Sequence, residues 1–191
     1  MQDVKKDRNK YLGGRDIPII MGISPFKTRF DLLLEKADLL VNEFEGNVYT
    51  EYGNVLEPKI RAYIIEIKNT EYIEYKIVNN DVRCHLDGYN GDSVLEIKTT
   101  SQIRKKVTSY KKYLVQLLFY MQEVKASSGI LAVYARPKDF NEEFSEELLN
   151  VYEININDYL ELLGEVNAAI EKFRIDLEKV KKNPFIEESE L

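Results

Sequence analysis

Apolar residues recur three and four positions apart in several stretches of the chain, the spacing of a helix with one buried face. Helices are therefore predicted over residues 28–40 and 102–124, from about residue 53 to 68, and from about residue 158 to 182. In the stretch 102–124 the apolar stripe consists of Tyr110, Leu114, Leu117, Met121 and Val124.

Shorter stretches rich in Tyr, Ile and Val are bounded by turn-forming residues, which is typical of β-strands. These stretches are residues 71–78, 82–89, 93–99, 129–136 and 148–156. Asn79-Asn80-Asp81 and Asn90-Gly91 are turn signals between the first three strands, which are therefore expected to form an antiparallel meander. The order helix, helix, three strands, helix, two strands, helix predicts an α/β domain with a mixed central β-sheet flanked by helices.

Composition supports one folded unit. The chain has 191 residues, 44% of them hydrophobic and 31% charged, which suits a single domain over residues 1–191 with loose ends at about 1–8 and 186–191. It has no apolar run of the roughly 18 residues that cross a bilayer and no signal-peptide pattern, so no membrane association is expected. The only cysteine, Cys84, excludes a disulfide framework and a zinc ribbon and fits a reducing, cytoplasmic location. Cys84 is expected to pack as a small buried hydrophobe, and His85 to be a structural strand residue.

The net charge of −6 argues against a nucleic-acid partner, but the distribution of charge changes this conclusion. Residues 1–30 carry seven basic and three acidic side chains, a net of +4, and residues 99–138 carry eight basic and one acidic, a net of +7. Residues 139–191 carry five basic and fifteen acidic side chains, a net of −10. Two basic segments are thus available to a polyanion, although solvated charged faces explain such blocks equally well.

The sequence HLDGYNGDSVLEIKTT places Asp87, Glu96 and Lys98 among residues typical of buried strands. If Asn90-Gly91 forms a two-residue hairpin loop, Asp87 lies opposite Val94, and Glu96 is its diagonal neighbour on the same face. Lys98 is two residues beyond Glu96 and shares that face, because side chains alternate along a strand.

Two converging carboxylates suit Mg²⁺ or Mn²⁺, since both ions prefer oxygen ligands and also bind phosphate oxygens. Such an ion neutralises charge on a phosphodiester and acidifies a bound water, and a neighbouring lysine stabilises the negative transition state. The pattern therefore indicates a phosphodiester-cleaving site. Spacing alone leaves an ordinary ion pair between Glu96 and Lys98 on a surface hairpin as the alternative.

LDGYNGDSVLEIKTT resembles the core motif of the PD-(D/E)XK nucleases, and the whole chain resembles the lambda-type exonucleases, also called YqaJ-like viral recombinases. Four further stretches match this family in order: GGRDIPIIMGISPFKTRFDLLLEKADL, YGNVLEPKIRAYI, YLVQLLFYMQ, and a closing helix with Phe173 and Asn183-Pro184. The match covers roughly residues 8–185 and implies a restriction-endonuclease-like core.

The resemblance also implies a role for each matching position. The implied metal ligands are Asp87, Glu96, the backbone carbonyl of Ile97, and Glu57, the last directly or through water. The implied catalytic residues are Lys98, Glu96, Asp87, Glu57, Gln116 and Tyr120. The implied cofactor is Mg²⁺ or Mn²⁺, with two ions in the site.

The spacing of the candidate residues in the predicted helices also allows interpretations that do not depend on the resemblance. Gln116 and Tyr120 are four residues apart and share a helix face with Lys112, so this face can turn Gln116 towards a metal-bound water or a phosphate. Core packing is the alternative for Tyr120. Pro58 follows Glu57, which suggests an acid in the first turn of its helix, where the helix dipole favours it.

Residues of the N-terminal segment are candidates for binding DNA phosphates. Ser24 and Lys27 either cap the following helix or contact a phosphate. Arg15 stands where the family's Gly-Gly-Ser-Asp motif has the serine that, by resemblance, helps to hold a 5′-phosphate. Arg8 lies seven positions earlier, as the family's phosphate-binding arginine does. Either Arg15 replaces the serine contact with a charge-assisted one, or the phosphate pocket is altered.

The resemblance implies a Mg²⁺-dependent deoxyribonuclease that digests double-stranded DNA ends 5′ to 3′ and leaves 3′ overhangs for phage-type homologous recombination. It also implies a ring-shaped homotrimer around DNA and a single-strand-annealing protein as partner. An endonuclease or structure-specific nuclease of the same superfamily is an alternative, because the core motif does not fix polarity. A DNA-binding recombination protein without catalysis is a second alternative, against which the complete acid–acid–lysine set argues.

Overall fold

One mixed β-sheet forms the centre of the molecule, which a computed structural model describes over residues 7–41, 46–140 and 143–191. Its strands follow one another in chain order: β1 (Ile73–Asn79), β2 (Val82–Tyr89), β3 (Ser93–Thr100), β4 (Ser128–Ala135) and β5 (Leu149–Asn155). β3 and β4 are parallel, and all other neighbours are antiparallel. The predicted mixed sheet and the antiparallel order of its first three strands are confirmed.

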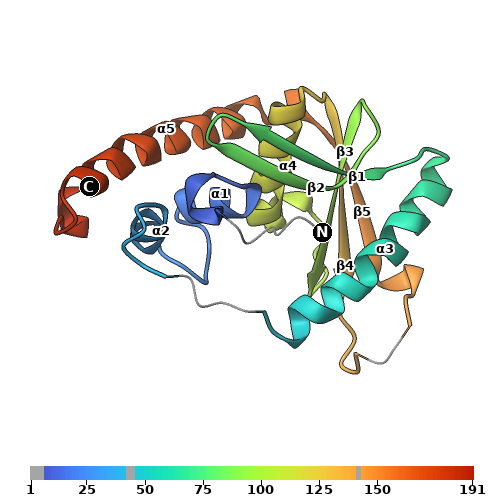
Figure 1. The fold of residues 1–191 in the computed structure, drawn as a ribbon. Coiled ribbons are helices and arrows are strands. Elements are labelled where there is room, and N and C mark those ends of the chain that lie inside the picture. The colour runs from blue at the N-terminus through green and yellow to red at the C-terminus, as the bar shows by residue number, and fades with distance from the viewer. Residues whose placement is uncertain (1–6, 42–45, 141–142) are drawn as a thin grey trace.

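Helices cover both faces of this sheet (Figure 1). They are α1 (Ile17–Ile20), α2 (Arg29–Lys36), α3 (Val48–Lys68), α4 (Lys111–Val124) and α5 (Leu160–Lys182). Short 3-10 turns occupy Arg8–Lys10, Gly14–Asp16, Val107–Tyr110, Glu146–Leu148, Ile156–Tyr159 and Glu188–Glu190. α3 lies on one face; α4 crosses the other face between β3 and β4, and α1, α2 and α5 pack on the α4 side. Within the described ranges, no helix has both the length and the apolarity needed to cross a membrane.

The sheet separates two apolar cores. On the α3 side, Leu56 and Ile60 pack with Leu95 of β3. On the other side, Leu117 of α4 packs with Phe173 of α5. Because successive side chains of β3 point to opposite faces, this strand contributes to both cores and is buried over most of its length.

α3 begins earlier than predicted. The side-chain oxygen of Asn47 accepts hydrogen bonds from the backbone N–H groups of Tyr49 and Thr50, both at 3.1 Å, and this cap starts the helix before the apolar stripe becomes regular. Of the predicted loose ends, residues 1–6 lie outside the described ranges, and the C-terminal one contains the turn Glu188–Glu190.

α4 begins later than predicted, at its Lys111, and residues 101–106 form an exposed loop instead of a first helical turn. The Tyr110 hydroxyl accepts a hydrogen bond from the backbone N–H of Arg104 at 2.5 Å and donates one to the carbonyl of Gln102 at 3.3 Å. These two contacts use backbone groups that a helix would need, so the loop is fixed against the start of α4. α2 also ends before the predicted residue 40.

β2 pairs with β3 only beside their connecting turn. Gly88 pairs with Leu95 and Tyr89 with Val94, whereas β3 pairs with β4 along its whole length. Beyond these pairs the β1–β2 hairpin leaves the sheet, and the buried side chains of β2 join the core on the α4 side. Asp87 therefore lies at the point where the two strands separate.

A buried acid ties α2 to α5. Asp176 is 1% exposed, and its carboxylate accepts hydrogen bonds from Arg29 at 2.7 Å, Lys172 at 2.8 Å and Lys179 at 3.0 Å. Burial by itself would raise the pKa of Asp176, but the hydrogen bonds from the three cations outweigh it and hold that pKa well below its usual value. The ion cluster therefore stabilises the fold only while Asp176 is ionised.

Replacing this acid should make stability depend less on pH. Asp176→Asn should lower the free energy of unfolding at pH 7 by about 1–3 kcal/mol, because charged hydrogen bonds are lost. The difference from the wild type should shrink as pH falls below about 4, where Asp176 becomes protonated on unfolding. Urea unfolding at pH 7 and at pH 3.5 measures both values. A difference that is equal at the two pH values, or equal to that of Glu171→Gln on the exposed side of α5, contradicts the assignment.

Candidate active site

The turn between β2 and β3 is centred one residue later than predicted. The side-chain oxygen of Asn90 accepts hydrogen bonds from the backbone N–H groups of Asp92 at 2.9 Å and Ser93 at 2.7 Å, which makes Asn90 the first residue of the turn. Gly91 follows with a φ of +99°, which favours glycine. The prediction that Asp87 lies opposite Val94 is therefore wrong.

The corrected register brings the two acids closer than the predicted diagonal. Tyr89 is the residue opposite Val94, and continuing this register places Asp87 directly opposite Glu96. The two strands have begun to separate there, and the Asp87 side chain bridges them: its Oδ2 accepts a hydrogen bond from the backbone N–H of Ile97 at 2.7 Å. Asp87 thus contacts the backbone of Ile97, the residue whose carbonyl the resemblance implies as a metal ligand.

Glu96 is a fully buried acid, with 0% of its side chain exposed. Its Oε1 forms an ion pair with the ammonium of Lys98; apart from this contact, neither carboxylate oxygen has a hydrogen-bond donor in the described part of the chain. Burial and then the neighbouring charge of Asp87 raise the pKa of Glu96 to about 8, against the opposing effect of Lys98. Burial alone would lower the pKa of Lys98, but the two carboxylates outweigh it and raise that pKa.

These residues fit a divalent cation. Two acids lie close enough to repel each other electrostatically, and the oxygens of one of them are buried without hydrogen-bond donors, an arrangement that a positive ion relieves. Among residues 7–41, 46–140 and 143–191, no three acidic, histidine or cysteine side chains form a metal-binding group. Asp87, Glu96 and the carbonyl of Ile97 are the groups at this point that could hold such an ion.

Glu57 lies in the middle of α3, so the prediction of a first-turn acid is wrong. Its carboxylate accepts a hydrogen bond from Arg61, one turn later, at 2.5 Å, and Arg61 also contacts Glu74 of β1 at 3.0 Å. Burial, followed by the charge of Asp87, raises the pKa of Glu57, which places it in the field of the acid pair. Arg61 was not singled out from the sequence, although its i,i+4 spacing from Glu57 is a signal for such a pair.

α4 brings two polar side chains into the core facing the acid pair. Gln116 and Tyr120 are both buried, and Gln116 donates a hydrogen bond to the Tyr120 hydroxyl at 3.1 Å. Burial raises the pKa of Tyr120 well above its usual value, and the charges of Glu96 and Asp87 raise it further. Tyr120 is therefore a core residue that also lies near Glu96 and Asp87. Core packing and a position beside the candidate site both describe it.

The N-terminal segment approaches the same site at Gly14, which packs against the ring of Tyr120. Gly14 lies so close to Tyr120 that a Cβ added there would be 2.3 Å from ring atom Cε1. Arg15 follows at once; its side chain is exposed, and its charge acts on both Glu96 and Lys98. The requirement for glycine at position 14 was not predicted from the sequence, since it depends on a side chain more than a hundred positions away.

A buried ion pair anchors this segment to α2. The ammonium of Lys36 contacts Asp16 at 2.8 Å and donates hydrogen bonds to the carbonyls of Tyr11 at 2.5 Å and Arg8 at 3.1 Å. Asp16 also accepts a hydrogen bond from the backbone N–H of Gly13 at 2.9 Å. The Arg8 side chain is exposed at the start of the segment. Lys36 was missed by sequence analysis, where it resembles any solvated lysine in a last helical turn.

The remaining phosphate candidates lie near the starts of α2 and α4. Thr28, not Ser24 or Lys27, caps α2: its hydroxyl accepts a hydrogen bond from the backbone N–H of Asp31 at 3.0 Å. The capping role considered for Ser24 and Lys27 is therefore wrong. Ser24 accepts a hydrogen bond from Phe26 within its own loop at 3.3 Å, and Lys27 forms an ion pair with Glu35. Their contact with a phosphate, and that of Lys112, stays a prediction.

Cys84 is fully buried, as expected, and burial raises the pKa of its thiol to about 12. His85 is a half-buried residue of β2 that pairs with Lys76 of β1, and burial followed by the charges of Lys76 and Arg83 lowers its pKa. Both residues occupy regular strand positions.

Solved structures show the same fold. The phage-related exonuclease from Haemophilus somnus 129PT superimposes with a TM-score of 0.64 at 16% identity, covering 88% of this chain and 95% of the other. The alkaline exonuclease LHK-Exo from Laribacter hongkongensis gives a TM-score of 0.57 at 18% identity over 93% and 94% of the two chains. LHK-Exo in complex with dAMP gives 0.56 at 18% identity over 92% and 93%. The fold is that of the restriction-endonuclease-like nucleases.

Sequence comparison defines the family within this class. The chain belongs to the YqaJ-like viral recombinase family, whose domain matches residues 3–126, more than half of the 191 residues. A comparison with curated proteins gives no match. The domain match thus shows the family, and the solved structures show the fold.

The burial of Glu96 makes a prediction about stability. Glu96→Gln should raise the free energy of unfolding of the metal-free protein at pH 7 by about 1–2 kcal/mol. The raised pKa of Glu96 makes this acid unfavourable for folding at pH values above its ordinary pKa, and Lys98 keeps the charge of Asp87 beside it in the variant. Mg²⁺ should raise the melting temperature of the wild type and leave that of the variant unchanged, since a ligand stabilises only the state that binds it. Thermal unfolding with and without Mg²⁺ measures both effects, and Glu165→Gln, at an exposed position of α5, is the control variant. Equal Mg²⁺-induced shifts in all three proteins refute the site.

Proposed function

We propose that this protein is a Mg²⁺-dependent deoxyribonuclease that digests double-stranded DNA ends 5′ to 3′ and leaves 3′ single-stranded overhangs for phage-type recombination. The observation that carries the proposal is the buried Glu96, which faces Asp87 and whose oxygens, in the described part of the chain, have no hydrogen-bond donor apart from the ammonium of Lys98. A charge buried in this way is unfavourable for a fold unless it serves a bound cation.

Each residue has a role in this reaction. Asp87, Glu96 and the carbonyl of Ile97 hold one or two Mg²⁺ ions, and Glu57 contributes directly or through water. Bound Mg²⁺ supplies charge neutralisation at the phosphodiester and acidifies a water. Lys98 orients that water and stabilises negative charge in the transition state. The roles of Gln116 and Tyr120 are to position the same water or a phosphate oxygen.

The preference for a 5′ end rests on the N-terminal segment. Arg15 lies next to the Gly14–Tyr120 contact and acts electrostatically on Glu96, so an anion held by Arg15 would lie beside the scissile phosphate. We assign the 5′-phosphate to Arg15 and Arg8, with Ser24, Lys27 and Lys112 on the path of the DNA backbone. Arg15 can bind a phosphate through two parallel hydrogen bonds, which the family's serine cannot.

The assembly is proposed from the resemblance and the distribution of charge. A homotrimeric ring would place the basic segments 1–30 and 99–138 towards DNA and the acidic segment 139–191 outward. A single-strand-annealing protein is the proposed partner, and the cytoplasm the proposed location. An endonuclease of the same superfamily is the alternative; in it Arg8 and Arg15 have no 5′-phosphate to bind.

The form of the DNA substrate decides between these functions. Linear duplex DNA should be degraded in Mg²⁺, whereas closed circular DNA should stay intact, because an exonuclease needs an end. Lys98→Ala and Asp87→Ala should each lower the rate on linear DNA by at least about a hundredfold while the protein stays folded. Gel analysis of linear, nicked and closed circular DNA provides the readout. Cleavage of closed circles favours the endonuclease, wild-type rates in either variant reject the active site, and no cleavage of any DNA by the wild type rejects catalysis.

The assignment of Arg15 predicts a change in end preference. Arg15→Ala should lower the ratio of kcat/KM for 5′-phosphorylated over 5′-hydroxyl ends by about tenfold or more, the effect of losing a charged hydrogen bond. Arg174→Ala, which removes an arginine paired with Asp81 on the surface, should leave the ratio unchanged. Initial rates on two duplexes that differ only in the terminal phosphate measure it. An Arg15→Ala ratio equal to that of the wild type excludes a phosphate role.

A further inference from the structure

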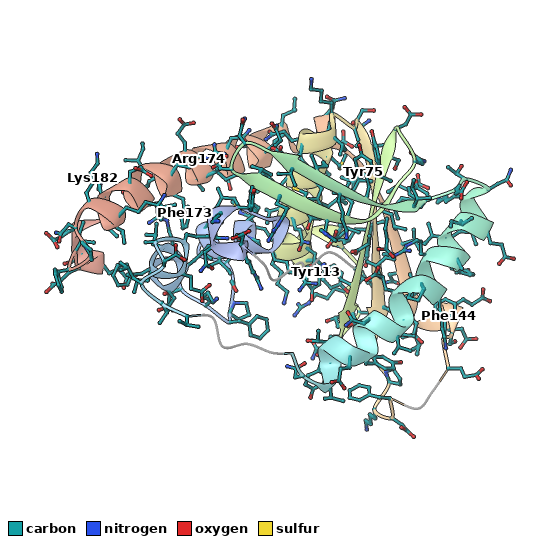
Figure 2. All side chains as sticks on the ribbon, viewed as in Figure 1. Tyr75, Tyr113, Phe144, Phe173, Arg174 and Lys182 are labelled. Atoms are coloured by element: carbon teal, nitrogen blue, oxygen red, sulfur yellow. The ribbon has the colours of Figure 1, made fainter. Side chains whose placement is uncertain are left out.

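Aromatic rings and basic residues gather on a strip at the N-terminal end of α4. The strip consists of Phe26, Arg104, Tyr110, Lys112, Tyr113 and Tyr152. Its members come from the α1–α2 loop, the loop after β3, the start of α4 and β5, so the fold brings together residues that are distant in the sequence. Tyr113 marks its centre in Figure 2.

Continuous contacts run along this strip. The ammonium of Lys112 lies 5.4 Å from the ring centre of Phe26 and 4.8 Å from that of Tyr113. Tyr113 stacks on Tyr110 at 5.9 Å with an interplanar angle of 19°, and Tyr110 contacts Tyr152 at 5.9 Å. A cation therefore lies between the rings of Phe26 and Tyr113 at one end. Tyr110 is 4% exposed and belongs to the core, so it supports Tyr113 from below and does not offer a free face.

Two of these tyrosines hold a basic loop against the strip. Arg104 donates its backbone N–H to the Tyr110 hydroxyl at 2.5 Å, and its carbonyl accepts a hydrogen bond from Tyr152. Residues 101–106 are exposed, and Lys105 and Lys106 follow Arg104 in this loop. The backbone of this basic loop is thus fixed beside the rings by two tyrosine hydroxyl groups.

Phe26 projects into solvent at the other end, with 87% of its surface exposed. Single exposed apolar side chains are common, and what distinguishes Phe26 is the ammonium of Lys112, which lies over its ring and joins it to Tyr113. The nearby acids Glu35 and Glu165 contact Lys27 and Lys111, which leaves the strip itself basic.

The strip leads to the candidate active site. Lys112 is one helical turn before Gln116, and Gln116 contacts Tyr120 beside the acid pair. At about 1.5 Å per residue, Lys112 and Tyr120 are about 12 Å apart along the axis of α4. A DNA strand that enters or leaves the site along α4 therefore crosses the strip.

We infer that this strip binds an unpaired DNA strand. Phe26 and Tyr113, on either side of Lys112, match a ligand with exposed base faces and a charged backbone, and among the forms of DNA a single strand offers both. In a duplex the base faces are covered by stacking and pairing, so it presents phosphates alone. The inference goes beyond the proposed function, because such binding requires neither a metal nor cleavage.

A fluorescent reporter at Phe26 tests the inference directly. The chain contains no tryptophan, so Phe26→Trp introduces a single indole into the strip. In metal-free buffer, a single-stranded oligonucleotide should quench this fluorescence by stacking, whereas a blunt duplex of the same length should not. Phe185→Trp, at a position 92% exposed on the C-terminal segment, is the matched control and should respond to neither. No quenching at position 26, equal quenching by duplex, or equal quenching at position 185 overturns the inference.

Affinity measurements separate the rings from the charges. Phe26→Ala should weaken binding of the metal-free protein to a fluorescein-labelled oligonucleotide by about tenfold, with an unchanged salt dependence. Lys112→Met should weaken it and lower the slope of log Kd against log salt by about 1. Wild-type affinity in Phe26→Ala overturns the inference. Because both measurements omit metal, single-strand binding by a protein that cleaves no DNA would reject the nuclease and leave this inference standing.

Discussion

The buried carboxylate of Glu96 is the constraint on which the arrangement of this molecule depends. A charge with 0% exposure in the middle of a strand is strongly unfavourable unless partners are brought to it. Lys98 supplies one partner from the same face of β3, and Arg15 adds positive charge from the N-terminal segment. Asp87 adds a second negative charge beside Glu96, and this repulsion makes a cation bound between the two acids more favourable. β3, the start of the β2–β3 hairpin and the N-terminal segment thus all bring charged groups to this one carboxylate.

The faces of the strands were predictable from the sequence, whereas the turn was not. Asp87, Glu96 and Lys98 share a face under both the predicted and the observed register, because a shift of two residues leaves strand alternation unchanged. The turn was misplaced because Asn90-Gly91 is a strong hairpin signal, while the Asn90 side chain uses its oxygen to begin the turn itself. The three side chains therefore share a face even though the turn was misplaced. A register error of one residue would have put Asp87 on the opposite face from Glu96 and Lys98.

Contacts between distant residues account for what the sequence could not predict. Lys36 resembles a solvated helix-end lysine until its partners in the segment from Arg8 to Asp16 are known. Gly14 resembles a flexible residue until Tyr120 is seen to occupy the place of its side chain. By contrast, the pair of Glu57 and Arg61 and the cap at Asn47 are local, and closer attention to spacing would have found both.

The crossover of α4 determines when the protein becomes competent during its synthesis. β3 obtains its parallel neighbour β4 only after the intervening helix has been made, because a parallel pair needs a long connection. A nascent chain that ends before Lys111 already contains every acid of the site, yet it lacks the helix that covers them. Most of the chain must therefore leave the ribosome before these acids are enclosed, which separates translation of the acids from assembly of the site.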